Sequence, residues 1–103
     1  MAYNLIITER AGEQLDNILN YLVNQLKSMQ AAKHLLSQVE VVYDTLEDNP
    51  FLYPVSRDPF LKSRDYREAI VPKMNYKIVF EIEDDEVTIL SIFHQLKNYP
   101  RKV

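Results

Sequence analysis

The sequence contains no cysteine, one glycine and only two histidines among its 103 residues. The missing cysteine excludes disulfides and thiolate chemistry. A single glycine excludes the glycine-rich loops that bind nucleotide phosphates, because those loops need several glycines close together. His34 and His94 are too few and too far apart to indicate a metal site, and no spaced carboxylate motif replaces them. We therefore expect neither a metal ion nor another cofactor.

Long apolar runs are also absent, since none approaches the roughly 20 residues that a membrane-spanning helix needs. The first ten residues, MAYNLIITER, lack the basic and apolar regions of a secretory signal. With 47% hydrophobic and 26% charged residues, the composition is that of an ordinary soluble globular protein. A chain of this length builds one core, so we predict a single cytoplasmic domain over residues 1–103 that does not bind membranes.

The net charge of −3 is unevenly distributed along the chain. Residues 1–56 carry −4 and residues 81–86 carry −5, whereas residues 57–80 and residues 87–103 each carry +3. The basic residues therefore gather in the second half of the chain, on both sides of an acidic segment. This pattern is compatible with a local anion site, but the overall acidity is not that of a general nucleic-acid binder.

Two apolar stripes with spacings of three and four residues predict two amphipathic helices. The first stripe spans residues 11–26 behind a candidate cap at Thr8, and the second spans residues 32–46. Residues 27–29 are the expected break between them. Asn49 and the proline after it are expected to end the second helix, because proline disfavours the helical conformation of its predecessor. The two helices are expected to form an antiparallel hairpin.

Short runs rich in Ile, Val, Phe and Tyr predict four strands. One strand is expected over residues 3–8, and an antiparallel meander of three strands is expected over residues 66–94. The last strand is apolar on both faces, which predicts a central position or a second covering element. The predicted fold class is therefore α+β: an N-terminal strand, then a two-helix hairpin packed on a twisted antiparallel sheet with a three-strand C-terminal meander (β-α-α-β-β-β).

The middle strand of the meander alternates between two faces. Its apolar face is predicted to meet the helices and consists of Tyr76, Ile78, Phe80 and Ile82. Lys77 is expected on the opposite face. A proline-rich loop over residues 50–63 precedes the meander. Four of its side chains are expected to pack on the core: Phe51, Leu52, Tyr53 and Phe60.

Bases and tyrosines gather in the sheet half of the chain. The set consists of Arg64, Arg67, Lys73, Tyr76, Lys77, His94, Lys97, Tyr99 and Arg101. Cleavage of RNA without a metal needs a base for the 2′-hydroxyl, an acid for the leaving oxygen and cations for the phosphorane charge. These residue types can supply all three roles. The alternative is that they are ordinary solvated bases on an exposed sheet face.

The order of these elements and several short motifs resemble the RelE/ParE toxin superfamily of bacterial type II toxin–antitoxin modules. The resemblance runs almost end to end, through Tyr3, Thr8, Ala11, Leu15, Ile18, Tyr21, Ala32, Leu35, the NPFLYP loop, Tyr66-Arg67, YKIVF at 76–80, Val87, Ile89, Ile92 and His94. It implies two helices packed on a twisted antiparallel sheet. It also implies a small cognate antitoxin that wraps the toxin through an extended or helical segment.

Members of this superfamily divide between two activities. RelE-like members cut mRNA in the ribosome with basic residues and tyrosine, histidine or glutamate on the sheet, whereas ParE-like members poison DNA gyrase without cutting RNA. Arg67 matches the arginine commonly found on the first meander strand, and His94 matches the histidine that ends the last strand. Lys77 stands where an arginine is usual. The arginines that often follow the histidine are replaced by Gln, Leu and Lys.

The resemblance implies a toxin neutralised by a cognate antitoxin, and the departures bear on its target. Lysine lacks the planar guanidinium group with which arginine binds a phosphate in a bidentate manner. An acidic chain is also unfavourable for RNA binding, because affinity for RNA depends on neutralising phosphates. The long helix hairpin and the proline-rich loop also look more ParE-like. The first hypothesis is therefore ParE-like inhibition of DNA gyrase.

The second hypothesis is a metal-independent, ribosome-dependent mRNA endoribonuclease. Its candidate catalytic residues would be Arg67, Lys77, His94, Tyr76 and Tyr99. The third hypothesis is a toxin-like fold without toxicity. The helix hairpin and the open sheet edges also offer surfaces for a homodimer.

Overall fold

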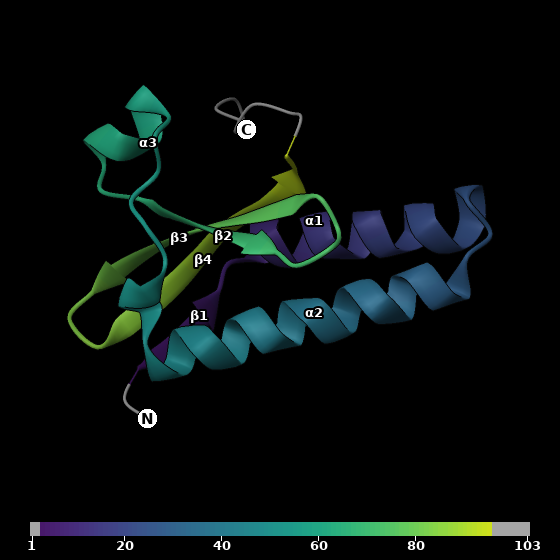
Figure 1. Cartoon of the computed structure of the whole chain (residues 1–103), viewed down its shortest axis with the longest axis horizontal. Helices are drawn as coiled ribbons and strands as arrows, with labels where there is room; N and C mark the ends of the chain where they lie inside the picture. Colours follow the sequence, from purple (N-terminus) through teal and green to yellow (C-terminus); the bar gives the residue numbers. More distant parts are fainter. Residues whose placement is uncertain (1–2, 96–103) are drawn as a thin grey trace.

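The computed structural model describes residues 3–95, which form a four-stranded sheet with helices on both of its faces (Figure 1). In chain order the elements are β1 (Asn4–Ile7), α1 (Glu9–Asn20), α2 (Met29–Asp48), α3 (Pro59–Ser63), β2 (Arg67–Val71), β3 (Tyr76–Glu83) and β4 (Glu86–His94). The predicted α+β class and order of elements are confirmed. No helix within residues 3–95 has the length and apolarity needed to cross a bilayer.

The sheet is mixed, whereas the sequence predicted a purely antiparallel one. Its strand order is β1-β4-β3-β2, and β2, β3 and β4 form the predicted antiparallel meander. β1 instead pairs in parallel with β4, with Asn4 opposite Glu86 and Ile7 opposite Ile89. The reason is the path of the helix hairpin. α1 leads away from the C-terminal end of β1, and α2 returns the chain to the side of the sheet where the N-terminal end of β1 lies. β2 therefore runs in the direction of β1, and two reversals later β4 does so too.

α1 completes the hydrogen bonding of the β4 edge where β1 ends. The hydroxyl of Thr8 accepts from the first turn of α1, as predicted for the cap, and donates to the carbonyl of Ile89 at 2.8 Å. Gln14, farther along α1, accepts with Oε1 from the Ser91 hydroxyl at 2.9 Å and from the Ile92 amide at 3.0 Å. Side chains of α1 thus replace a strand partner and fix the helix beside β4.

The helix hairpin begins and ends close to the predicted positions. The first helix continues beyond α1 as a π-helical turn, Tyr21–Gln25. Lys27 has a φ of 56° at the expected break, and the Ser28 hydroxyl accepts from the backbone of the first turn of α2. α2 ends before Pro50, as expected.

The main core lies between the two helices and one face of the sheet. On β3 the predicted apolar face is confirmed, because Ile78 and Phe80 are fully buried there and Tyr76 and Ile82 pack beside them. β4 occupies a central place in the sheet and is covered on both faces, which confirms the interpretation of its apolar sequence.

A smaller core on the opposite face is covered by α3, which lies across the sheet from α1 and α2 (Figure 1). Leu61 of α3 is 1% exposed and packs on Val79 of β3 and Phe93 of β4. The expectation that the loop side chains pack on the core is confirmed for Tyr53 and Phe60, which are partly buried against the two cores.

The same expectation is wrong for two loop residues. Phe51 is 55% exposed and Leu52 is 66% exposed. They belong to a short 3-10 turn, Pro50–Leu52, in which Pro50 takes the buried position. Phe51 instead makes an edge contact with the Tyr3 ring, at a centroid distance of 6.3 Å.

Two adjacent leucines of α2 give a direct test of the helix–sheet core. Leu35 is 0% exposed, whereas Leu36 is 41% exposed. We expect Leu35→Ala to lower the free energy of unfolding by about 2–5 kcal/mol, because it leaves a cavity. Leu36→Ala should change it by less than about 0.5 kcal/mol. Urea unfolding followed by circular dichroism measures both, and equal losses would contradict this packing.

Candidate functional site

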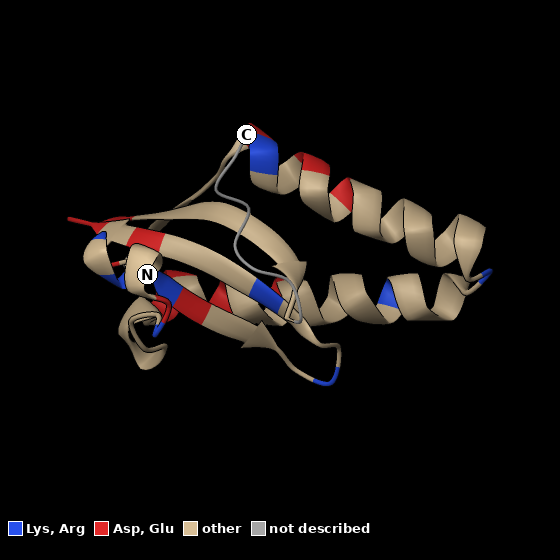
Figure 2. Ribbon diagram, turned by 90° about the horizontal axis from the view of Figure 1, so that it is seen from above, with Lys and Arg blue, Asp and Glu red and all other residues tan. Residues whose placement is uncertain are grey.

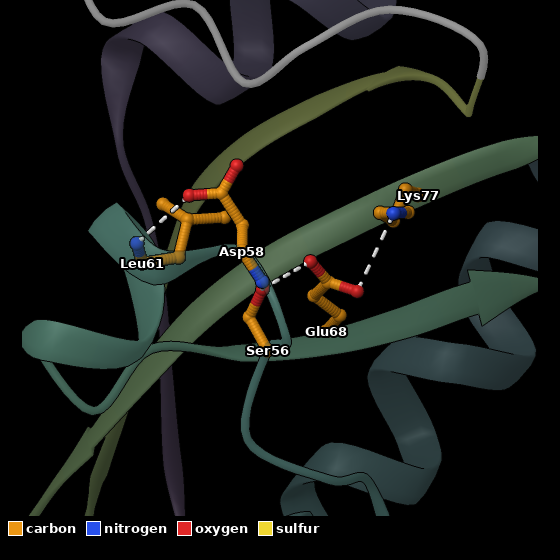
Figure 3. A network of polar contacts seen from close by, with 5 residues as sticks. All are labelled: Ser56, Asp58, Leu61, Glu68 and Lys77. Atoms are coloured by element: carbon orange, nitrogen blue, oxygen red, sulfur yellow. Dashed lines mark hydrogen bonds and ion pairs between the residues drawn. The ribbon is translucent and has the colours of Figure 1, made fainter.

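Neighbouring residues on β3 place the predicted site residues on different faces of the sheet. Tyr76 packs on the helix-facing core, and Lys77 points to the face that α3 covers. Lys77 Nζ lies 3.4 Å from Oε1 of Glu68 on β2, and both side chains are mostly buried (Figure 3). The lysine that stands at the expected arginine position is therefore held in an ion pair within the sheet.

Glu68 also links the sheet to α3 (Figure 3). Its second carboxylate oxygen accepts from the hydroxyl of Ser56, which is 2% exposed. The Ser56 oxygen in turn accepts from the backbone amide of Asp58 at 3.1 Å. Asp58 caps α3, because its Oδ1 accepts from the amides of Phe60 at 2.9 Å and Leu61 at 3.2 Å. One carboxylate thus connects Lys77 to the cap of the helix that covers this face.

Tyr76 and His94 come together at the opposite face, beside α1. They are paired across β3 and β4, and their rings meet edge to face with centroids 5.4 Å apart. A pocket of about 560 Å³ opens next to them. Its lining is formed by Gln14, Asn17, Ile18, Tyr21, Tyr76, Ile92, Phe93 and His94. Burial raises the pKa of Tyr76 above its ordinary value of 10.0, and the neighbouring Tyr21 raises it further.

Arg67 lies toward the other end of the sheet and holds the proline-rich loop. It pairs with Phe80, four residues from Tyr76 along β3 and so about 13 Å away. Its Nη1 donates to the carbonyl of Tyr53 at 2.6 Å, and its guanidinium lies 5.0 Å from the centre of the Phe51 ring. Both contacts stabilise the loop conformation.

Of the four predicted site residues that the structure describes, only Tyr76 and His94 lie together. Lys77 lies on the opposite face, and Arg67 lies farther along the sheet. Tyr99 lies outside the described residues. Cleavage of a phosphodiester requires acid, base and cation within hydrogen-bonding reach of the same reacting atoms. Arg67, Lys77, Tyr76 and His94 do not share such a position.

Sequence reasoning missed Glu68, Ser56 and Asp58. Part of the signal was present, because Asp58 followed by Pro59 is a typical start of a helix. Glu68 carried no such signal, since its role depends on a cross-strand neighbour and on a loop twelve residues away. Gln14 was also missed, because an amphipathic stripe does not reveal which polar residue meets a strand edge.

Exposed apolar side chains form the other candidate contact surfaces. Three of them, Tyr21, Leu26 and Met29, surround the turn of the helix hairpin and are 50–55% exposed. Ile6 and Ile7 lie on β1 at the sheet edge, with 40% and 47% of their surface exposed. Such side chains can serve as contact points for another protein.

Replacing Glu68 tests the link between the sheet and α3. Glu68→Ala removes the acceptor of Ser56 and the counter-ion of Lys77, so we expect the free energy of unfolding to fall by about 1–3 kcal/mol. Glu68→Gln keeps an acceptor for the hydroxyl and should cost less. The control is Glu83→Ala on the exposed end of β3, with a change below about 0.5 kcal/mol. Equal losses for Glu68→Ala and Glu83→Ala would argue against the link.

Two tyrosines should make stability depend on alkaline pH. Burial raises the pKa of Tyr43 above 10.0, and the pKa of Tyr76 is raised as described. The folded state favours the neutral phenol. The contribution of each tyrosine to the free energy of unfolding is therefore complete below pH 10 and is lost as pH rises through the raised pKa. Between about pH 9 and about pH 11, the free energy of unfolding of Tyr43→Phe and of Tyr76→Phe should fall less than that of the wild type. Curves identical to wild type would contradict the expectation.

Comparison with known proteins agrees with this fold. The family model described as ParE toxin of type II toxin-antitoxin system, parDE, matches residues 5–99. A solved structure described as the chromosomal ParDE TA system from P. aeruginosa is similar, with a TM-score of 0.66 and 20% identity over 90% of this chain and 96% of that chain. No curated protein matches. At this identity the solved structure shows the fold alone, but the family model spans nearly the whole chain. The chain belongs to the ParE toxin family of type II toxin–antitoxin systems.

Proposed function

We propose that this toxin acts by binding and inhibiting DNA gyrase, and that a cognate antitoxin neutralises it. The observation that carries the proposal is the dispersion of the candidate catalytic residues. Tyr76 and His94 share one face, Lys77 is paired with Glu68 on the other, and Arg67 holds the loop. Side chains arranged in this way stabilise the fold and do not converge on one scissile bond.

The contacts of the two cations support the same conclusion. Lys77 and Glu68 lie 3.4 Å apart, and moving the lysine to a phosphate would leave the mostly buried carboxylate without its counter-ion. Arg67 donates to the Tyr53 carbonyl, so a phosphate would compete with a contact that fixes the loop. Both cations therefore have structural partners that a substrate would have to displace.

Membership of the ParE family also favours a binding mode, because ParE-like members act on gyrase and do not cut RNA. A protein inhibitor needs a contact surface more than it needs an acid–base pair. Tyr21, Leu26 and Met29 provide one at the turn of the helix hairpin, which projects away from the sheet (Figure 1). Aromatic and long apolar side chains of this kind commonly dominate binding energy in protein interfaces.

One observation favours the RelE-like endoribonuclease as a second candidate. Tyr76 and His94 are in ring contact beside a pocket, and a phenol with an imidazole can act as acid and base. Among residues 3–95, no lysine or arginine lines this pocket to stabilise the phosphorane charge. Among the described residues this candidate therefore has an acid and a base but no cation at the same place.

The two activities are separated by assaying one set of variants in two ways. Inhibition of supercoiling by purified gyrase measures the first activity, and mapping of mRNA 5′ ends after induction without antitoxin measures the second. We expect gyrase inhibition without new mRNA ends. Leu26→Asp at the hairpin turn should weaken inhibition about tenfold or more, and the control Leu36→Asp, on the exposed face of α2, should not.

The pocket variants complete the experiment. Tyr76→Phe combined with His94→Gln should leave gyrase inhibition within about twofold of wild type, because it leaves Leu26 and Met29 of the hairpin turn unchanged. New mRNA ends within codons that vanish in this variant would establish the ribonuclease and overturn the proposal. Normal growth, intact mRNA and uninhibited gyrase would point to a fold without toxicity.

A further inference from the structure

Acidic residues are absent from one end of the molecule. The chain has 15 acidic residues, yet none falls between Asp16 and Glu40 or between Glu68 and Glu81. The first interval contains the end of α1, the hairpin turn and the first half of α2, and the second contains the β2–β3 turn. Figure 2 shows blue but no red on the hairpin turn, on the adjoining part of α2 and on the β2–β3 turn. In a chain of net charge −3, this end is therefore the basic one.

Three exposed lysines of this end come from separate segments. Lys27 lies in the hairpin turn, Lys33 lies in the second turn of α2, and Lys73 lies in the β2–β3 turn. Among residues 3–95, none of the three forms an ion pair. Lys77, which also belongs to this part of the chain, is already paired with Glu68. The charges of the three exposed lysines are therefore available to a partner.

A hollow of about 680 Å³ lies between the start of α2 and the β2–β3 turn. Its lining is formed by Ser28, Gln30, Ala31, Lys33, His34 and Met74. Met74 also packs on the main core, which holds the β2–β3 turn beside α2. Since Lys27 precedes Ser28 and Lys73 precedes Met74, the three lysines border the same hollow.

The local conformation does not account for the charge at this end. Lys27 has a φ of 56° and Lys73 a φ of 67°, in the left-handed region that glycine and asparagine adopt more readily than lysine. The charges of α2 also oppose its dipole, because its first turn has no acidic residue and its last turn has Glu47 and Asp48 without a base. Neither arrangement stabilises the fold.

Exposed apolar side chains accompany the lysines. Leu26 and Met29 are 54% and 55% exposed, and they flank Lys27 in the hairpin turn. Such a mixture of apolar and basic groups is complementary to a protein surface on which acidic residues surround an apolar centre. A DNA backbone would pair with the lysines but would leave the apolar side chains without a contact.

We propose that Lys27, Lys33 and Lys73 dock the hairpin turn on an acidic surface of a gyrase subunit, with Leu26 and Met29 in apolar contact at its centre. This inference rests on the proposed inhibition of gyrase and specifies the chemistry of the surface that the toxin recognises. An acidic target attracts the basic end and repels the acidic remainder of the toxin, so the charges orient the approach. Pairs of this kind raise the association rate more than they add affinity.

Removal of the three charges tests the docking. Lys27→Gln with Lys33→Gln and Lys73→Gln keeps long polar side chains at exposed positions, so circular dichroism should match that of the wild type. We expect binding to DNA-free gyrase holoenzyme to weaken about tenfold at low salt, mostly through slower association, because each exposed pair contributes modestly. The difference should shrink to within about twofold at about 0.5 M salt, where the charges are screened. Biolayer interferometry measures the rates.

The matched control removes three cations from the loop before α3 and from α3 itself. Arg57→Gln with Lys62→Gln and Arg64→Gln changes the net charge by the same amount at three exposed positions. Association with gyrase should stay within about twofold of wild type, because this region lies away from the hairpin turn. Equal losses in the two triple variants would show that only net charge matters and would overturn the proposal.

The salt dependence of the unmodified toxin gives a readout that needs no variant. Pairing of the lysines with carboxylates predicts slower association as the salt concentration rises. Repulsion between the net-negative toxin and an acidic target predicts faster association instead. Faster association would therefore contradict docking through the basic end.

Adding DNA separates the alternative partner. If the triple lysine variant binds DNA-free gyrase normally but binds the gyrase–DNA complex more weakly than wild type does, the lysines contact phosphates and the proposal is wrong. If it binds normally with and without DNA, docking through the basic end is wrong as well. In both cases the proposed inhibition of gyrase stands. If the wild-type toxin neither binds nor inhibits gyrase, the proposed function fails and this inference fails with it.

Discussion

The fold depends on backbone hydrogen bonds along both edges of β4. This strand has nine residues and lies inside the sheet, whereas β1 has only four residues to offer as a partner. Thr8, which caps α1, bonds Ile89 of β4, and Gln14 of α1 bonds Ser91 and Ile92, so side chains attach the first helix to the strand. Together with the core between the helices and the sheet, these contacts position the helix hairpin.

The two faces of the sheet differ in what they contain. Beside α1, the end of β4 leaves a pocket next to Tyr76 and His94. On the other face, Glu68 binds both Lys77 and Ser56, and so ties α3 to the sheet. Bases that resembled a catalytic set in the sequence are therefore divided between the faces, where some of them stabilise loops and strands.

Sequence reasoning predicted the elements whose signals are local. The two apolar stripes, the Thr8 cap, the stop at Pro50 and the three-strand meander were all found, because spacing and turn residues determine them. The parallel pairing of β1 with β4 was not predicted, because it depends on the number of times the chain reverses direction between these two strands. The exposure of Phe51 was also not predictable, since it depends on which neighbour occupies the buried position.

The site was less predictable than the fold for a related reason. The residue types in the sequence suggested an acid, a base and a cation. Only the three-dimensional contacts show that one of these cations, Lys77, is already paired with Glu68. The mode of action proposed for this ParE-family toxin is contact with a protein target. Selection of host mutations that allow growth when the toxin is expressed without antitoxin tests this claim most directly. Resistance mutations in the gyrase subunit genes are the predicted result, and resistance confined to ribosomal genes would contradict it.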